Sequence, residues 1–201
     1  MSQPEFWISI GSTYSYLTVS RLPRIEERTG IRFDWRPFSV REIMIEMNNI
    51  PFATKPAKAA YMWRDIERRA GMYGLEPKLP AAYPLAEFDR ANRVAILGRQ
   101  EGWVRDYVIA TYRLWFEHGL EAGSQENLTR ALSEVGVDAD EVIARAASDE
   151  IGAAYRAATD EARQRGIFGA PSIVVDGELF WGDDRLEDAL SWARDRRVSA
   201  S

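Results

Sequence analysis

A short apolar strand that leads straight into a helix is the feature that most limits how this chain can fold. Residues 6–10, FWISI, are mostly apolar or β-branched and predict a buried strand. Gly11 permits a tight turn, and apolar residues recur at helical spacing from residue 14 to residue 30. Ser12 lies where the N-cap of that helix is expected, so on local grounds alone it is a capping serine. The free amides of a first helical turn also favour an anion there and lower the pKa of a nearby thiol.

A second strand, residues 31–37, follows the helix, with apolar residues alternating with charged ones. A strand, a helix and a strand at this spacing predict a parallel βαβ unit. No strand pattern occurs between about residue 40 and residue 170, where helices are expected over residues 40–48, 57–72, 86–100, 103–118, 124–134 and 149–165, with a capping box at Asp138 and Glu141. A hairpin then joins residues 172–176 to residues 178–181 through Asp176-Gly177, and a last helix starts at Gly182.

The order β-α-β, helical insertion, β-β-α predicts an α/β protein with a thioredoxin-like fold. Residues 1–40 and 166–201 would form the thioredoxin-like domain, and residues 41–165 an all-helical insertion. Pro171 must lie at the start of the strand that follows it, because proline cannot donate to a sheet ladder. In a thioredoxin-like arrangement this is the position of a cis-proline, whose preceding peptide group faces outward and can pair with an extended peptide. The alternative is an ordinary trans-proline. Only about 5–6% of X-Pro bonds are cis, so the cis expectation depends on the fold analogy.

Composition argues against several classes of function. The net charge is −5 with no basic tail, which argues against a dedicated nucleic-acid binder. No apolar run has the length of a membrane span, and residues 1–5 show no signal-peptide pattern, so a cytoplasmic protein is expected. The chain contains no cysteine and one histidine, so it has no disulfide or cysteine nucleophile and no zinc site is expected. Any thiol chemistry must therefore come from a bound small molecule.

Five stretches in order across residues 5–195 match the motifs of one family. They are residues 12–16 (STYSY), Arg36-Pro37, Asn49 and Pro51 followed by Lys58 and Tyr61, residues 166–172 (GIFGAPS) and residues 180–186 (FWGDDRL). Together they resemble the S-P-(Y/F)-S-Y, R-P, N-x-P…K-x-x-Y, G-x-(F/W)-G-x-P-(S/T) and F-(F/W)-G-x-D-R-(L/M) motifs of the 2-hydroxychromene-2-carboxylate isomerases. These enzymes belong with the kappa-class glutathione transferases in the DsbA-like branch of thioredoxin folds. Thr13 stands where the family usually has proline, which favours the first helical position, but the change removes no catalytic group.

The family binds glutathione, so the resemblance implies roles for residues of this chain. Ser12 would donate its hydroxyl hydrogen bond to the glutathione sulfur and so favour the thiolate. The backbone of Ala170, before Pro171, would pair with the cysteinyl part of glutathione. Asp183 and Asp184 would hold the γ-glutamyl end, with a carboxylate for its ammonium and helix amides for its carboxylate. The simpler alternative for both aspartates is a helix cap.

The resemblance also suggests residues on the other side of the cleft. Asn49 and Lys58 would lie there, with Lys58 near a glutathione carboxylate. Tyr14 and Tyr83 are candidates to line a flat aromatic substrate, and Arg36 is a candidate to meet its carboxylate. The simpler alternatives are that Lys58 is a solvated helix charge and that Asn49 is a turn residue.

These expectations describe a glutathione-dependent isomerase that interconverts 2-hydroxychromene-2-carboxylate, or a related aromatic acid, with trans-o-hydroxybenzylidenepyruvate. The thiolate would add to the unsaturated substrate, and ring opening, bond rotation and elimination would follow. One alternative is a kappa-like glutathione transferase or peroxidase, which uses the same thiolate on another electrophile. Another is a non-catalytic thioredoxin-fold protein that binds a peptide or partner along the edge at Pro171. The resemblance further implies a homodimer whose ligand partner is a small aromatic carboxylate rather than a nucleic acid or a membrane.

Overall fold

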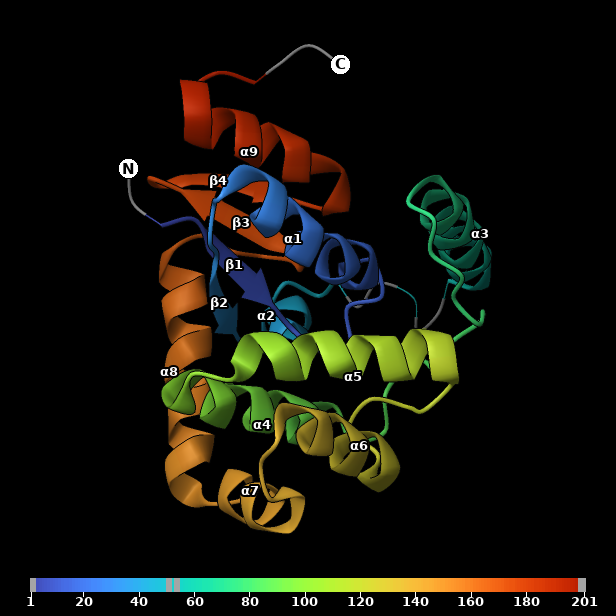
Figure 1. Ribbon diagram of the computed structural model, residues 1–201, viewed down its shortest axis with the longest axis vertical. Coiled ribbons are helices and arrows are strands. Elements are labelled where there is room, and N and C mark those ends of the chain that lie inside the picture. The colour runs from blue at the N-terminus through green and yellow to red at the C-terminus, as the bar shows by residue number, and fades with distance from the viewer. Residues whose placement is uncertain (1–2, 50–51, 53–54, 199–201) are drawn as a thin grey trace.

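The computed structural model describes residues 3–49, 52 and 55–198, and its centre is a four-stranded sheet in the order β2-β1-β3-β4 (Figure 1). The strands are β1 (Glu5–Ile8), β2 (Asp34–Pro37), β3 (Ser172–Val175) and β4 (Glu178–Trp181). β1 and β2 are parallel, with Phe6 opposite Trp35, and β3 is antiparallel to both β1 and β4. This mixed sheet confirms the predicted thioredoxin-like α/β fold and its parallel βαβ unit.

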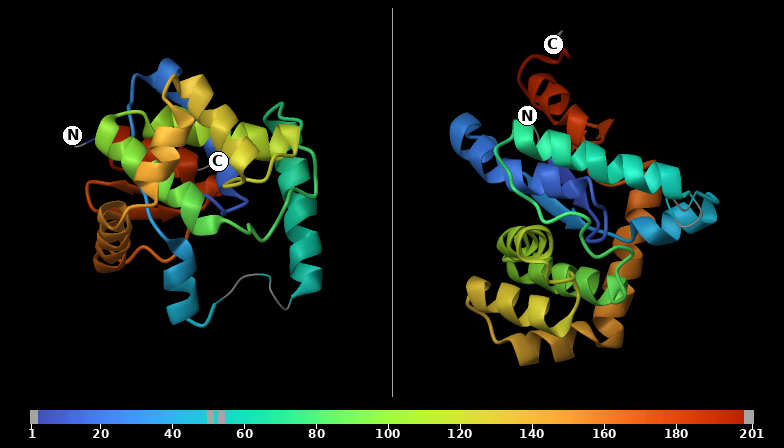
Figure 2. Two further views of the ribbon diagram at one scale, coloured as in Figure 1. Left: turned by 90° about the horizontal axis from the view of Figure 1, so that it is seen from below. Right: turned by 90° about the vertical axis from the view of Figure 1, so that its right-hand side faces the viewer.

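Helices form the connections from β1 to β2 and from β2 to β3, and a further helix follows β4. The described part of the chain forms α1 (Ser15–Thr29), α2 (Val40–Glu46), α3 (Pro56–Met72), α4 (Phe88–Glu101), α5 (Val104–His118), α6 (Gln125–Val135), α7 (Ala139–Ala146), α8 (Asp149–Gln164), a 3₁₀ turn η1 (Asp183–Arg185) and α9 (Leu186–Asp195). α9 packs on β3 and β4, while α4 and α8 pack on β2. α4 to α7 lie together below the sheet in Figure 1, and α3 lies beside α1 (Figure 2).

The helix ends and the hairpin follow the predicted local chemistry. α1 ends at Gly30, which is left-handed with a φ of 72°. Ser124 and Asp138 cap α6 and α7, because their side chains accept the backbone N–H three residues later. Asp176 and Gly177 have φ values of 47° and 91°, and they form the two-residue turn between β3 and β4.

Both N-terminal strands are shorter than the sequence pattern predicts, because side chains compete with the sheet for their backbone groups. β1 ends before Ile10, whose N–H and C=O both bond to the side chain of Asn92. β2 starts after Phe33, whose N–H donates to the carboxylate of Glu26. The residues that end these strands come from helices, so the local alternation of apolar residues does not reveal them.

The buried apolar side chains form one cluster that extends from the sheet into the helices. Tyr16 on α1 stacks on Phe116 of α5 with ring centroids 4.3 Å apart, which joins the first helix to the helical block. The predicted thioredoxin-like domain (residues 1–40 and 166–201) and the predicted helical insertion (residues 41–165) share this one core. The division into two domains therefore stays a prediction. No helix in the described ranges combines the length and apolar character needed to cross a bilayer.

Candidate active site

The turn between β1 and α1 is held by two buried side chains of the helical block. The Asn92 amide accepts the N–H of Ile10 and donates to its C=O, each at 2.8 Å. The Tyr112 hydroxyl lies 3.0 Å from the carbonyl oxygen of Ser12 and 3.2 Å from that of Ser9. Asn92 and Tyr112 are fully buried. They fix the backbone on both sides of Gly11, so Ser12 is presented by a rigid turn.

Ser12 lies against the peptide group that precedes Pro171. The Ala170-Pro171 bond is cis, which confirms the prediction made by fold analogy. Ser12 Oγ donates a hydrogen bond of 2.6 Å to the carbonyl oxygen of Ala170. The local interpretation of Ser12 as a helix cap is wrong, because α1 begins at Ser15 with Tyr14 at the N-cap position and no side-chain cap. The Ser12 hydroxyl instead joins the start of α1 to the cis-proline loop, across 158 residues of sequence.

A cavity of about 250 Å³ opens beside the cis-proline. Its walls come from the start of α1, from α3 and from the segment that leads from β4 into η1. The lining residues are Tyr14, Asp65, Arg69, Ala170, Pro171, Trp181, Gly182, Asp183 and Asp184. The exposed indole of Trp181 meets Phe168 edge to face with ring centroids 4.8 Å apart, which gives the cavity one apolar wall. Five of these nine residues were predicted as site residues from the sequence.

The adjacent aspartates Asp183 and Asp184 have different environments in the 3₁₀ turn η1, which precedes the last helix. Asp183 is buried, and its carboxylate accepts hydrogen bonds from Thr18 at 3.0 Å, Arg21 at 3.1 Å and Tyr73 at 3.3 Å. Burial raises the pKa of Asp183, and Arg21 and Thr18 oppose that shift. Asp184 is exposed and pairs with its neighbour Arg185 at 3.0 Å. Asp183 therefore ties η1 to α1 and α3, while Asp184 is the carboxylate that faces solvent.

Tyr14 connects the first helix to α3 at the cavity wall. Its hydroxyl donates to Oδ2 of Asp65 at 3.0 Å. Burial and the neighbouring Asp65 carboxylate raise the pKa of the Tyr14 phenol well above its ordinary value, so it stays protonated and acts as a donor. Tyr14 thus lines the cavity with its hydroxyl already bonded, and its contact with an aromatic substrate stays a prediction.

Comparison with known proteins identifies the family. A family model described as a DSBA-like thioredoxin domain matches residues 5–191. A 2-hydroxychromene-2-carboxylate isomerase of Sphingobium xenophagum is 31% identical over 193 residues, which are 95% of this chain and 97% of that protein. The chain belongs to the DsbA-like thioredoxin family.

More distant relatives agree with that membership. A glutathione S-transferase kappa 2 of Caenorhabditis elegans is 24% identical, over 90% of this chain and 87% of that protein. A solved structure of 2-hydroxychromene-2-carboxylate isomerase has the same fold, with a TM-score of 0.81, 23% identity and coverage of 91% of this chain and 90% of that one. The backbone that carries Ser12, Pro171 and Asp184 therefore has the fold of that solved structure.

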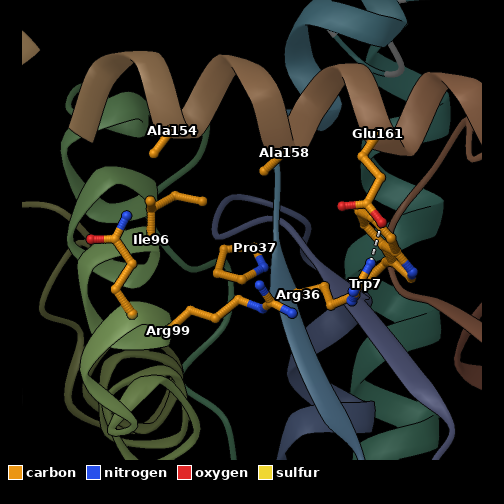
Figure 3. A pocket seen from close by; sticks show the side chains of 9 residues that line it. Trp7, Arg36, Pro37, Ile96, Arg99, Ala154, Ala158 and Glu161 are labelled. Atoms are coloured by element: carbon orange, nitrogen blue, oxygen red, sulfur yellow. Dashed lines mark hydrogen bonds and ion pairs between the residues drawn. The ribbon is translucent and has the colours of Figure 1, made fainter. Parts of the chain in front are cut away.

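Arg36, which the sequence predicts to bind the substrate carboxylate, lines a different cavity from the one beside Pro171 (Figure 3). That cavity of about 130 Å³ lies between β2, α4 and α8 and shares no lining residue with the one beside Pro171. Arg36 donates from Nε to Asp34 at 2.7 Å and from Nη1 to Glu161 at 2.5 Å, and its guanidinium lies over the Trp7 ring. These internal partners occupy the guanidinium, and the structure does not bring Arg36 to the other predicted residues.

Three more predicted residues lie outside the lining of the cavity at Pro171. Tyr83 is half-buried and packs edge to face on Trp63 and Phe52, with ring centroids 6.2 and 5.9 Å away. Lys58 is exposed with Nζ 5.7 Å from the Phe52 ring centroid. Asn49 is exposed and uses its N–H in a turn. Their roles in ligand binding stay predictions, and Pro51 of the same motif lies outside the described residues.

Sequence reasoning missed the residues that support the site from the helical block. Asn92 had one available signal, since it is a polar residue among apolar neighbours on the buried face of α4. The sequence holds no such signal for Tyr112, Asp65 and Arg69. An aromatic residue in a helix predicts a place in the core, and charged residues on a helix predict a solvent-exposed face. Among the described residues, no cluster of three or more histidine, aspartate or glutamate side chains is placed to hold a metal ion.

Proposed function

We propose that this protein is a glutathione-dependent isomerase that interconverts 2-hydroxychromene-2-carboxylate, or a related aromatic acid, with trans-o-hydroxybenzylidenepyruvate. The single observation that carries the proposal is the 2.6 Å hydrogen bond from Ser12 to the carbonyl before the cis-proline, in a chain without cysteine. The similarity to an isomerase of this name at 31% identity supports the reaction class. A homodimeric, cytoplasmic enzyme remains part of the proposal.

The chemistry of the cavity beside Pro171 fits one end of glutathione. The γ-glutamyl group carries an ammonium and a carboxylate, and the lining offers carboxylates at Asp65 and Asp184 for the ammonium. The peptide group of Ala170 precedes the cis-proline, where an extended peptide can pair with the backbone. The apolar face of Trp181 closes the cavity on the side of β4. These residues would hold the cofactor with its sulfur toward Ser12.

When bound, glutathione supplies a thiolate that adds reversibly to the unsaturated substrate and so allows rotation about a carbon–carbon bond. The Ser12 hydroxyl would turn its hydrogen from the Ala170 carbonyl to this sulfur. A hydrogen bond to a charged group contributes about 1.5–3 kcal/mol, against about 1 kcal/mol for one between neutral groups, so the exchange favours the ionised sulfur. The positive end of α1 stabilises the same charge. Because one pKa unit corresponds to about 1.4 kcal/mol, Ser12 alone can lower the thiol pKa by about one unit.

A kappa-like glutathione transferase or peroxidase is the second candidate function. It is favoured by the 24% identity to a kappa-class transferase over 90% of the chain. Both activities would use Ser12 and the same sulfur, and they differ only in the electrophile. Turnover of the chromene acid, of chlorodinitrobenzene and of an organic hydroperoxide, each with and without glutathione, distinguishes the candidates.

The deciding experiment combines titration calorimetry with turnover in wild type and Ser12→Ala. We expect glutathione to bind wild type, and Ser12→Ala to retain binding while turnover falls about 10- to 100-fold through loss of the charged hydrogen bond. Ser133→Ala on the exposed face of α6 is the matched control and should behave as wild type. Absence of glutathione binding at millimolar concentration contradicts the proposal and favours a non-catalytic binding protein. Full activity in Ser12→Ala removes Ser12 from the mechanism.

A further inference from the structure

An arginine of α3 faces the cavity beside Pro171, and no motif of the family accounts for it. We propose that Arg69 binds the free α-carboxylate at the γ-glutamyl end of glutathione, so that the cavity selects ligands that end in a complete amino-acid headgroup. This inference rests on the proposed use of glutathione. It assigns a specificity-determining residue to the ligand end of the site, away from the reacting sulfur.

The position of Arg69 follows from the periodicity of α3. Asp65 and Arg69 are one helical turn apart, so their side chains leave the same face of the helix, and both line the cavity. Ile66 and Ala70 on the neighbouring face are fully buried and anchor the helix. α3 thus presents an acid and a base together to the cavity.

The ion pairs of Arg69 hold its guanidinium in place without using up its donors. Nε lies 3.6 Å from Oδ2 of Asp65, and Nη1 lies 3.7 Å from Oδ2 of Asp183. Both separations exceed the approximately 2.7–3.2 Å of an N–H···O hydrogen bond, so these contacts orient the group by charge. Tyr73 is a hydrogen-bond partner of the guanidinium and takes one of its five donors, and the Tyr73 hydroxyl itself donates to Asp183 at 3.3 Å. The planar fork keeps N–H groups available for a carboxylate in the cavity.

A second arginine nearby, Arg21, has a structural role and differs from Arg69 in its contacts and exposure. Arg21 donates to Asp183 at 3.1 Å, lies 3.9 Å over the Tyr73 ring and has a side chain that is only 12% exposed. Arg21 and Thr18 already neutralise and bond the Asp183 carboxylate, so that group does not require Arg69. Arg69 is 30% exposed and lines the cavity, which is the position of a ligand-binding group.

The charges around the cavity select a zwitterion. Three carboxylates line it, from Asp65, Asp183 and Asp184, and Arg69 is the one cation among the nine lining residues of the described chain. An ammonium group can therefore choose between acidic partners, whereas a carboxylate has Arg69 alone as a cationic partner in the lining. An α-amino acid headgroup satisfies both, and a ligand without the carboxylate leaves Arg69 between two acids with its fork unfilled.

The test is calorimetric binding of two ligands, glutathione and its analogue in which the γ-glutamyl α-carboxylate is an amide. We expect wild type to bind glutathione about 10- to 100-fold more tightly than the amide. Arg69→Gln should lose that preference by weakening glutathione alone, and Arg69→Lys should keep part of it, because lysine has charge but no fork. Arg64→Gln, on the same helix and paired with Glu67 at the surface, is the matched control and should bind as wild type.

The outcomes separate this inference from the proposed function. If wild type binds both ligands equally, or if Arg69→Gln weakens both by the same factor, Arg69 does not recognise the carboxylate and the inference is overturned. The wild-type comparison needs no variant, so it stands even if Arg69→Gln fails to fold. If wild type binds glutathione normally while Arg69 proves irrelevant, the proposed function survives. If wild type binds neither ligand, the proposed function fails, and the inference fails with it.

Discussion

Replacing Asn92 by alanine removes the side chain that ties the Ser12 turn to the helical block. Asn92 makes two 2.8 Å hydrogen bonds to the N–H and C=O of Ile10 and a third, of 2.9 Å, to the carbonyl of Phe88. Ile10 is fully buried, so the truncation leaves two backbone groups without a partner away from water. Each such group costs about 1–3 kcal/mol, which gives a loss of about 2–6 kcal/mol in the free energy of unfolding. That loss is large against a typical total of about 5–15 kcal/mol.

The assay is urea unfolding of wild type and Asn92→Ala, together with glutathione binding under conditions where both are folded. Asn127→Ala is the matched control, because Asn127 is also fully buried and bonds backbone carbonyls, those of Thr111 and Leu120, away from the turn. We expect both variants to lose stability and only Asn92→Ala to lose glutathione affinity, since only that change frees the backbone before Ser12. An Asn92→Ala protein as stable as wild type would refute the energetic argument. Equal loss of affinity in both variants would refute the positioning role.

Two further changes test the backbone of the turn and the second cavity. Gly11→Ala should lower the melting temperature markedly, because Gly11 has a φ of 122° and an added Cβ would lie 2.5 Å from the ring of Phe88; a change within experimental error would contradict the close packing. Burial opposes ionisation of Asp34 and Glu161, but the hydrogen bonds from Arg36 hold the pKa of each below its ordinary range. Carboxylates whose pKa is lowered in the folded state stabilise the protein above about pH 4, and this stabilisation is lost as the pH falls. The free energy of unfolding of Arg36→Gln, measured with urea, should therefore fall less steeply with acid than that of wild type. If the free energy of unfolding depends on pH identically in both proteins, these ion pairs contribute nothing to stability, which is common for ion pairs at protein surfaces.

The sequence by itself determined the elements whose causes are local. Gly30 ends α1 because only a residue free to adopt a positive φ fits there, and Asp176-Gly177 forms the hairpin turn for the same reason. The order of strands and helices, together with the position of Pro171, was enough to predict the sheet and the cis peptide bond through the fold they imply. Each of these features depends on a residue and its neighbours in the chain, and a pattern in the sequence can record that.

Only the tertiary structure decided what the polar side chains do. Ser12 occupies a capping position in the pattern, yet its hydroxyl bonds Ala170, 158 residues away. Asp183 and Asp184 are adjacent and chemically identical, but one is buried among Thr18 and Arg21 and the other faces solvent. The partners of Asp183 come from α1 and the end of α3, far away in the sequence, and hydrogen bonds between distant segments leave no periodic trace in the chain. Local propensity therefore predicts the backbone, while burial and long-range pairing assign each side chain its chemistry.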